Sequence, residues 1–189
     1  MNLALAQHNI SVQEYLDGEP LSDIRHEYLA GQVYAMAGAG ERHNRITLNI
    51  AFHLRTITRG TPCGVYVNDM KLRVVQHDSF YYPDVMVACD PQDTHSLYKQ
   101  FPCLVAEVLS PSTEAIDRRE KLIVYRSLPS MRHYLLVSQD LRRVEWHSRD
   151  EQDRWSLAVQ EGSGSIDIAC HDLRKTITMD EIYEDVKLS

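Results

Sequence analysis

A run of seven strand-forming residues at positions 103–109, apolar except for Glu107, constrains the fold more than any other stretch of this chain. Such continuous apolar runs are typical of strands that are buried on both faces of a sheet. An ionised carboxylate is costly to bury unless a cation, a proton or several hydrogen-bond donors lie beside it. The chain must therefore fold so that a partner reaches Glu107.

A second apolar run, over residues 82–89, carries Asp84 near its start. After the Glu107 run come a Ser- and Pro-containing loop and a polar helix start that holds Asp117 and Lys121. Two carboxylates on neighbouring strands with a lysine nearby are what a hard divalent cation and a metal-bound water require. We therefore treat Asp84, Glu107 and Lys121 as the candidate catalytic residues.

Helix signals occur at four places in the chain. Three capping-box patterns, Ser or Thr or Asp followed three residues later by Glu, predict helix starts. Apolar residues at helical spacing predict one longer helix. The expected helices cover residues 12–16, 43–58, 118–127 and 179–186.

The remaining apolar segments are read as strands. A hairpin over residues 25–36 is expected to turn at Gly31, because glycine adopts the positive backbone angle that a tight turn needs. Residues 65–75 and 133–138 are read as strands, the second beside the Glu107 strand after a helical crossover. Three short segments near 144–147, 155–159 and 166–169 suggest an antiparallel extension. The expected class is α/β (α+β), with a mixed central sheet flanked by helices.

Length and composition indicate one globular domain over residues 1–189, with residues 1–10 as a loose tail. Hydrophobic residues make up 43% of the chain and charged residues 25%, which is ordinary for a packed domain. No run approaches the roughly 18 apolar residues of a membrane span, and the start lacks the zones of a signal peptide. We expect a cytoplasmic protein with no membrane partner.

The four cysteines, at positions 63, 89, 103 and 170, are widely spread and form no Cys-x-x-Cys pair. Three of them lie in strand-like apolar settings. Free cysteines are among the most buried residues, so we expect buried thiols rather than zinc ligands or disulfides.

The net charge of −7 argues against a protein that coats nucleic acid non-specifically, because phosphate contacts are made mainly by lysine and arginine. Residues 118–143 are nonetheless basic, with seven basic residues against two acidic ones. Either this segment faces a phosphate backbone beside the carboxylates, or it is a solvated helix face and a hairpin turn.

The carboxylate spacing has a known counterpart. Pro83-Asp84, 22 intervening residues and then Glu107, with Val and Leu after it, resembles the PD-(D/E)XK nuclease superfamily. That pattern has lysine two residues after the glutamate, where this chain has Leu109. In relatives with this gap the lysine comes from the following helix, which makes Lys121 the candidate here.

A longer string is more specific. Glu-Val-Leu-Ser-Pro-Ser-Thr over residues 107–113, followed by Asp117, Lys121 and Tyr125, resembles the Uma-type restriction-endonuclease-like family of that superfamily, formerly a domain of unknown function. The resemblance runs over residues 14–183. It implies a restriction-endonuclease-like core.

The resemblance also implies an activity, that of a Mg²⁺-dependent (or Mn²⁺-dependent) endonuclease acting on nucleic acid, with DNA as the expected substrate. Asp84, Glu107 and the main-chain carbonyl of Val108 would hold the metal through oxygen ligands. Lys121 would orient the attacking water or neutralise the phosphate. Nucleases that cut both strands commonly dimerise, so a homodimer is expected by analogy.

Four further residues are accessory candidates, and each has a simpler reading. Glu27 either points to the site or is an exposed strand residue. His43, in the opening turn of the long helix, either contacts a phosphate or carboxylate or is structural. Asp69 is either a third carboxylate or part of an Asn-Asp turn, and Asp117 either joins the site or only caps its helix.

Two rival functions remain open at this point. In the first, a nuclease-like fold has lost catalysis and serves as a nucleic-acid-binding or assembly module, which Leu109 and the acidic net charge favour. In the second, Glu107 pairs with Lys121 or an arginine as a buried ion pair, no metal binds, and the protein acts through protein contacts only.

Overall fold

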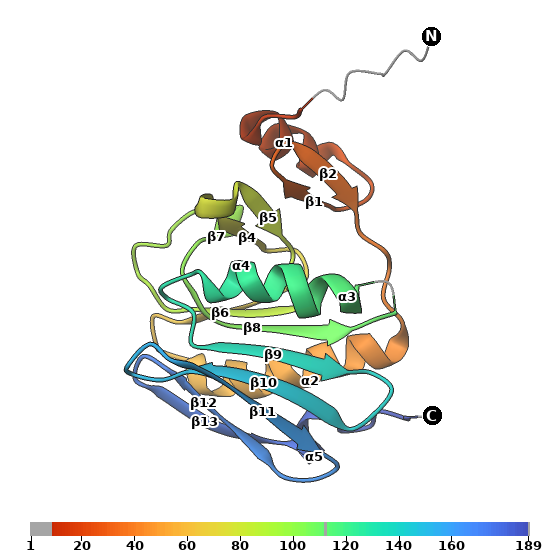
Figure 1. Ribbon diagram of the computed structural model, residues 1–189, viewed down its shortest axis with the longest axis vertical. Helices are drawn as coiled ribbons and strands as arrows, with labels where there is room; N and C mark the ends of the chain where they lie inside the picture. The colour runs from red at the N-terminus through yellow and green to blue at the C-terminus, as the bar shows by residue number, and fades with distance from the viewer. Residues whose placement is uncertain (1–8, 112, 189) are drawn as a thin grey trace.

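A computed structural model describes residues 9–111 and 113–188 and is built around a six-stranded mixed sheet (Figure 1). Only the central pair β8–β9 is parallel, and the other neighbours are antiparallel. The strand order is β11 (Trp155–Glu161), β10 (Arg143–Arg149), β9 (His133–Ser138), β8 (Pro102–Leu109), β6 (Val85–Ala88) and β3 (Gly64–Val67). The expected α/β (α+β) class with a mixed sheet and flanking helices is confirmed.

Helices cover both faces of this sheet. The long helix α2 (Glu41–Thr58) buries Ile46, Ile50 and Leu54 against one face. The other face is covered by the crossover between β8 and β9, which comprises α3 (Glu114–Ile116), the π-helical segment η3 (Asp117–Lys121) and α4 (Leu122–Arg126). This parallel connection through a helix is the predicted one.

A second sheet stands beside the crossover helices, and the N-terminal helix lies at its far end, next to β1 and β2 (Figure 1). Its order is β2 (Gln32–Ala35), β1 (His26–Leu29), β5 (Ser79–Tyr81), β4 (Lys71–Val74) and β7 (Tyr98–Lys99), with α1 (Val12–Gly18), η1 (Glu19–Leu21) and η2 (Val75–His77) attached. The predicted hairpin is confirmed, with Gly31 at φ +89°. The predicted single strand over residues 65–75 is wrong, because the chain turns at Asn68 and passes from one sheet to the other.

The C-terminal region closes the α2 face. The hairpin β12 (Ser165–Cys170) and β13 (Leu173–Thr178), followed by α5 (Met179–Ile182), packs its apolar residues into the same core as α2. The predicted capping boxes at Ser11 and Thr178 are both present. The one predicted at Asp117 is not, because the helical run begins at Glu114.

The expected loose tail, residues 1–10, falls mainly outside the described residues. Its last two members are held in place, since Ile10 donates its N–H to the carbonyl of Gly31 and Gln32 donates to the side chain of Asn9. None of the helices in the described part of the chain is long and apolar enough to cross a membrane.

The expectation of free cysteine thiols is wrong. The four cysteines form two disulfides, Cys63–Cys89 and Cys103–Cys170. The first follows from the pairing of β3 with β6, which sets the preceding and following cysteines side by side with their Cα atoms 3.9 Å apart. The second ties β8 to β12. Both pairings depend on tertiary contacts that residue spacing does not reveal.

Candidate active site

Asp84 and Glu107 face each other at one end of the central sheet. The register of β6 and β8 pairs Val85 with Ala106, so the next residues outward are these two carboxylates. Their hydrogen bonds interlock, because the Asp84 N–H donates to Glu107 Oε2 (3.3 Å) and the Val108 N–H donates to Asp84 Oδ2 (2.7 Å). The structure thus brings the two carboxylates together, with Glu107 on β8 and Asp84 directly before β6.

Side-chain alternation decides which face Glu107 occupies. Ala106 and Val108 pack toward α2, while Val105 and Leu109 pack toward α4. Glu107 lies between the last two and so points toward the crossover helices. Leu109, which stands where the superfamily pattern has lysine, is itself part of that apolar core.

Lys121 approaches Glu107 from the crossover. Its Nζ lies 3.2 Å from Glu107 Oε1, 3.1 Å from Glu27 Oε1 and 3.2 Å from Asp117 Oδ1. The residue is 95% buried, and its ammonium also lies over the ring of Tyr81. The reading of Lys121 as a solvent-exposed helix lysine is thus excluded, and the chain brings a lysine to Glu107 from the helix rather than from β8.

The backbone that carries Lys121 is π-helical rather than α-helical. Asp117 and Lys121 are the buried residues of η3 and lie on its side facing the sheet. The hydroxyl of Tyr134, on β9, donates to the main-chain carbonyl of Asp117 (3.0 Å). Short π-helical segments occur often at functional sites, where they re-aim side chains.

The charges of the site oppose one another strongly. Burial raises the pKa of Glu107 well above its usual value; Lys121 opposes this, and the carboxylates of Asp117, Asp84 and Glu27 add to it. Burial alone would lower the pKa of Lys121, but Glu107, Glu27 and Asp117 outweigh it and raise that pKa well above its usual value. The lysine is therefore held as a cation.

His43 and Glu27, two of the accessory candidates, lie at the site. His43, in the first turn of α2, places Nε2 3.1 Å from Asp84 Oδ2. Glu27, on β1, contacts Lys121 and accepts a long hydrogen bond from the N–H of Tyr82 (3.4 Å). The second sheet thus contributes a carboxylate to a site built mainly on the first.

The other two accessory candidates separate. Asp117 joins the site and does not cap the start of the helix; its buried Oδ1 lies 3.2 Å from Lys121 Nζ. Asp69 does not join the site, because it lies in the turn between β3 and β4, is 74% exposed and pairs with Arg25. The turn reading of Asp69 is the correct one.

The sequence reasoning gave no role to two tyrosines that border the site. Tyr125 is fully buried, and its hydroxyl donates to Glu107 Oε1 (3.1 Å). It lies four residues after Lys121, so helical spacing placed it on the same face as the lysine. Tyr134 had no comparable signal, because it reads as one more residue of a buried strand.

The donor set suits a divalent cation. Three carboxylates, those of Glu27, Glu107 and Asp117, contact the Lys121 ammonium, and a fourth, Asp84, lies beside Glu107. Carboxylate oxygens are the ligands that Mg²⁺ and Mn²⁺ prefer. Among the described residues, no three acidic, histidine or cysteine side chains already stand as a complete ligand set. The residues therefore match the ion in ligand type and charge but do not form a complete coordination site.

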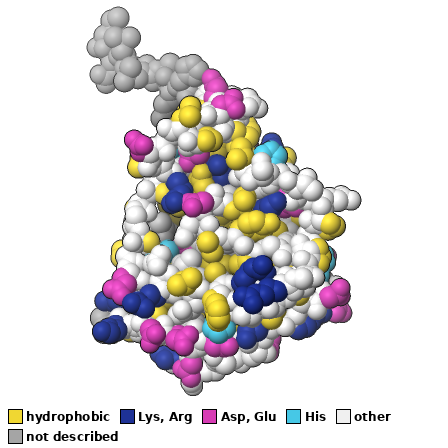
Figure 2. All heavy atoms as spheres, turned by 180° about the vertical axis from the view of Figure 1, so that it is seen from behind, with side chains coloured by type: hydrophobic (Ala, Val, Ile, Leu, Met, Phe, Trp, Pro, Cys, Tyr) yellow, Lys and Arg dark blue, Asp and Glu magenta, His cyan; other side chains and the backbone are white. Residues whose placement is uncertain are grey.

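The basic segment after the site is largely neutralised. In the described part of the chain, four of its arginines form ion pairs: Arg118 with Glu114 and Glu145, Arg132 with Asp153, Arg142 with Asp180, and Arg143 with Glu145 and Glu161. On the face that Figure 2 presents, the basic side chains form separate groups rather than one continuous stripe. These contacts favour the solvated-surface reading of this segment.

Comparisons with known proteins identify the family of the chain. The model of a family named Uma2, described as "Putative restriction endonuclease", matches residues 12–180. Two uncharacterized proteins of Synechocystis sp. (strain ATCC 27184 / PCC 6803 / Kazusa) are similar: slr1290 is 34% identical over 175 residues, covering 92% of this chain and 91% of that protein. The other, sll1609, is 33% identical over 159 residues, covering 82% and 90%.

A solved structure has the same fold. It is a crystal structure titled as "a putative nuclease belonging to DUF820" from Anabaena variabilis ATCC 29413, with a TM-score of 0.73 at 13% sequence identity. The match covers 92% of this chain and 97% of that one. At this identity the likeness establishes the architecture.

Proposed function

This chain belongs to the Uma2 family, and on that premise we propose that it is a metal-dependent endonuclease that hydrolyses phosphodiester bonds in DNA. The observation that carries the proposal is the contact of Lys121 Nζ with Glu107, 3.2 Å apart, beside Asp84. Lys121 would thereby replace the lysine that the superfamily pattern has at the position of Leu109. A homodimer, which would let one molecule cut each strand, is part of the proposal by analogy only.

Asp84 and Glu107 would hold Mg²⁺ or Mn²⁺, with the main-chain carbonyl of Val108 as a third oxygen. When bound, such an ion lowers the pKa of a coordinated water and stabilises charge that develops on the scissile phosphate. The Tyr125 hydroxyl holds Glu107 in place, and the His43 imidazole contacts and orients Asp84. Contacts of this kind orient ligands and tune their affinity.

Lys121 would act on the water or on the phosphate. Glu27 and Asp117 remain as its counter-charges when Glu107 turns to a metal, so the ammonium stays in position. Its raised pKa keeps it protonated, which suits a group that neutralises a phosphate or donates a hydrogen bond to the attacking water. It does not suit a general base.

The test is cleavage of supercoiled DNA, linear DNA, single-stranded DNA and RNA with Mg²⁺ or Mn²⁺. Wild type is compared with Glu107→Gln, Lys121→Met and, as a matched acidic control from the exposed turn between β12 and β13, Asp172→Asn. Cleavage lost in the first two variants and kept in the third supports both the metal pair and the relocated lysine. Cleavage lost only in Glu107→Gln would remove Lys121 from the mechanism.

The alternative is a catalytically inactive nucleic-acid-binding or assembly module. One observation favours it: Lys121 lies within 3.2 Å of three carboxylates, so the site is already partly compensated without a metal. Failure to cleave any substrate, in protein shown to bind the metal, would decide for this module. Failure to bind metal would decide for a purely structural ion pair.

A further inference from the structure

A second buried lysine, Lys71 on β4, has no counter-charge at contact distance. It is 95% buried, yet within the described part of the chain no carboxylate forms an ion pair with it. Its ammonium lies over the ring of Tyr82, 5.2 Å from the centroid. Burial lowers its pKa, and the charge of Glu19 offsets this only in part. A buried cation without a paired anion is costly, so this position calls for a reason.

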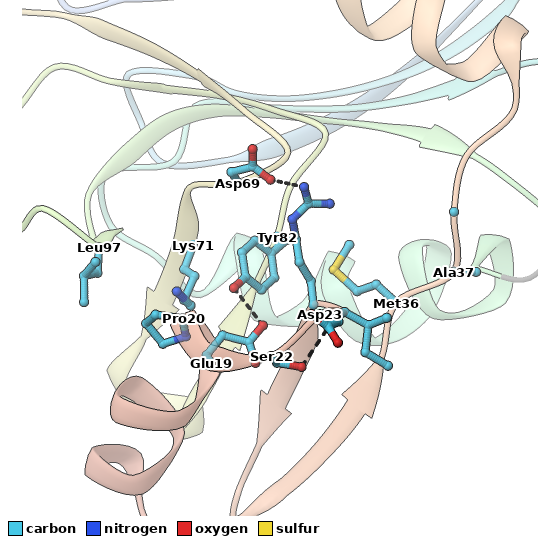
Figure 3. Close-up of a pocket in the computed structure, with 13 residues that line it drawn as sticks. Glu19, Pro20, Ser22, Asp23, Met36, Ala37, Asp69, Lys71, Tyr82 and Leu97 are labelled. Atoms are coloured by element: carbon cyan, nitrogen blue, oxygen red, sulfur yellow. Dashed lines mark hydrogen bonds and ion pairs between the residues drawn. The ribbon is translucent and has the colours of Figure 1, made fainter.

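Lys71 lines a cavity of about 540 Å³ between η1, the segments that flank the β1–β2 hairpin and the turn that carries Asp69 (Figure 3). Other lining residues are Arg25, Ser22, Met36 and Tyr82. Figure 3 shows Lys71, Tyr82 and Glu19 pointing toward one another from different elements. The cavity therefore offers a cation, an aromatic ring and apolar surface in one place.

The acidic groups of the cavity are already engaged. Glu19 accepts from the Tyr82 hydroxyl (2.9 Å) and from the N–H of His26 (2.7 Å). Asp69 pairs with Arg25 at the cavity mouth. Asp23 also lines the cavity and is exposed, so solvent screens its charge. Lys71 is the lining cation that a bound anion would satisfy.

The cavity adjoins the candidate active site. Tyr82 forms part of its wall, and the N–H of the same residue contacts Glu27, which in turn contacts Lys121. Asp84 follows Tyr82 by two residues. Two extended residues span about 7 Å, so Tyr82 connects the cavity wall to the segment that carries Asp84.

We infer that this cavity is a binding subsite for a nucleotide adjacent to the cleavage position in the DNA. Lys71 would contact a backbone phosphate of this nucleotide, and the cavity wall formed by Tyr82 would face its sugar or base. The inference rests on the proposed function, since it assigns part of the same substrate. It does not require that Lys71 take part in the chemistry, and we regard it as a positioning residue.

The test is DNA binding by fluorescence anisotropy, with a labelled duplex, Mg²⁺ and a series of salt concentrations. All proteins carry Glu107→Gln so that the duplex stays intact, and Lys71→Met and Lys71→Arg are compared with the parent. Loss of one phosphate contact is expected to weaken binding by about tenfold or more. It should also reduce the slope of log affinity against log salt by about 0.9. Lys71→Arg is expected to keep most of the affinity.

Lys99→Met is the matched control. Lys99 is also buried, on the neighbouring strand β7, but donates to the carbonyls of Asp93 and His95. Its loss should lower the melting temperature and leave DNA affinity unchanged, whereas Lys71→Met should keep or raise the melting temperature.

Two results would overturn the inference while leaving the proposed function intact. One is parental affinity and salt slope in Lys71→Met; the other is a fall in its melting temperature as large as that in Lys99→Met, which would make Lys71 a structural lysine. If the parent binds no DNA at all, the proposed function fails, and this inference fails with it.

Discussion

Replacing Lys121 by methionine tests the electrostatics of the site directly. The substitution keeps the length of the side chain and removes its charge, which leaves three carboxylates, Glu27, Glu107 and Asp117, without the cation they share. Removing one partner of a buried ion pair costs about 3–5 kcal/mol of unfolding free energy. For a chain of this size each kcal/mol lowers the melting temperature by about 2–4 °C. We therefore expect a fall of roughly 6–20 °C at neutral pH without metal.

Lys175 provides a matched control. Its Nζ lies 3.2 Å from Glu181 Oε1, the same distance that separates Lys121 from Glu107, but this pair is partly exposed. An exposed pair contributes about 0–1 kcal/mol. Lys175→Met should therefore cost at most a few degrees.

The pH dependence of Lys121→Met has a definite sign. Lys121 lowers the pKa of Glu107, so its removal raises that already elevated pKa further. A carboxyl whose folded pKa exceeds its unfolded value, about 4.3 for Glu, gives stability that is present below pH 4 and lost as pH rises through the folded pKa. The deficit of the variant should thus shrink on acidification. Denaturant unfolding from pH 4 to 8 measures it, and a loss below about 1 kcal/mol, or one independent of pH, would refute the reasoning.

Three further predictions concern the metal, the histidine and a disulfide. Mg²⁺ or Mn²⁺ should raise the melting temperature of wild type but not of Asp84→Asn. The shift should grow as pH rises through the raised pKa of Glu107, because metal binding displaces the proton of this carboxyl. A shift kept in Asp84→Asn would contradict the assignment of Asp84 as a metal ligand. His43→Ala should weaken metal binding about 10–100-fold in calorimetric titration, and unchanged affinity would make His43 structural. Replacing Cys63 and Cys89 by serine should lower the unfolding free energy by about 3–4 kcal/mol, whereas no change in denaturant unfolding would mean that the thiols are free.

The sequence predicted the centre of the sheet well because β6, β8 and β9 are buried, mostly apolar runs whose position is set by local composition. Glu107 stood out for the same reason, since a carboxylate in such a run has few structural explanations. The pairing of β8 with β9 was expected because a continuous apolar strand follows a helical crossover. Glu27 and His43 were identified as candidates, but only the packing of the second sheet and of α2 brings them to the site.

The errors share a physical cause, which is that tertiary contacts overrode local signals. Asp117 satisfies a capping-box pattern, yet the helical run starts earlier and the Tyr134 hydroxyl takes the Asp117 carbonyl within a π-helical segment. Asp69 lies in what reads as one strand, but the chain changes sheets there. Two of the cysteines, Cys103 and Cys170, are 67 residues apart and meet only after β12 packs on the core.

Cleavage of supercoiled DNA over a titration of Mg²⁺ tests the central claim most directly, with wild type compared to Glu107→Gln and to Asp172→Asn, a control in the exposed turn between β12 and β13. The account predicts no cleavage in EDTA and saturable cleavage by wild type and Asp172→Asn. It predicts that the cleavage rate of Glu107→Gln is at least about 100-fold lower than that of wild type, because the substitution removes a metal ligand. Cleavage in EDTA, or a wild-type rate in Glu107→Gln, would contradict it.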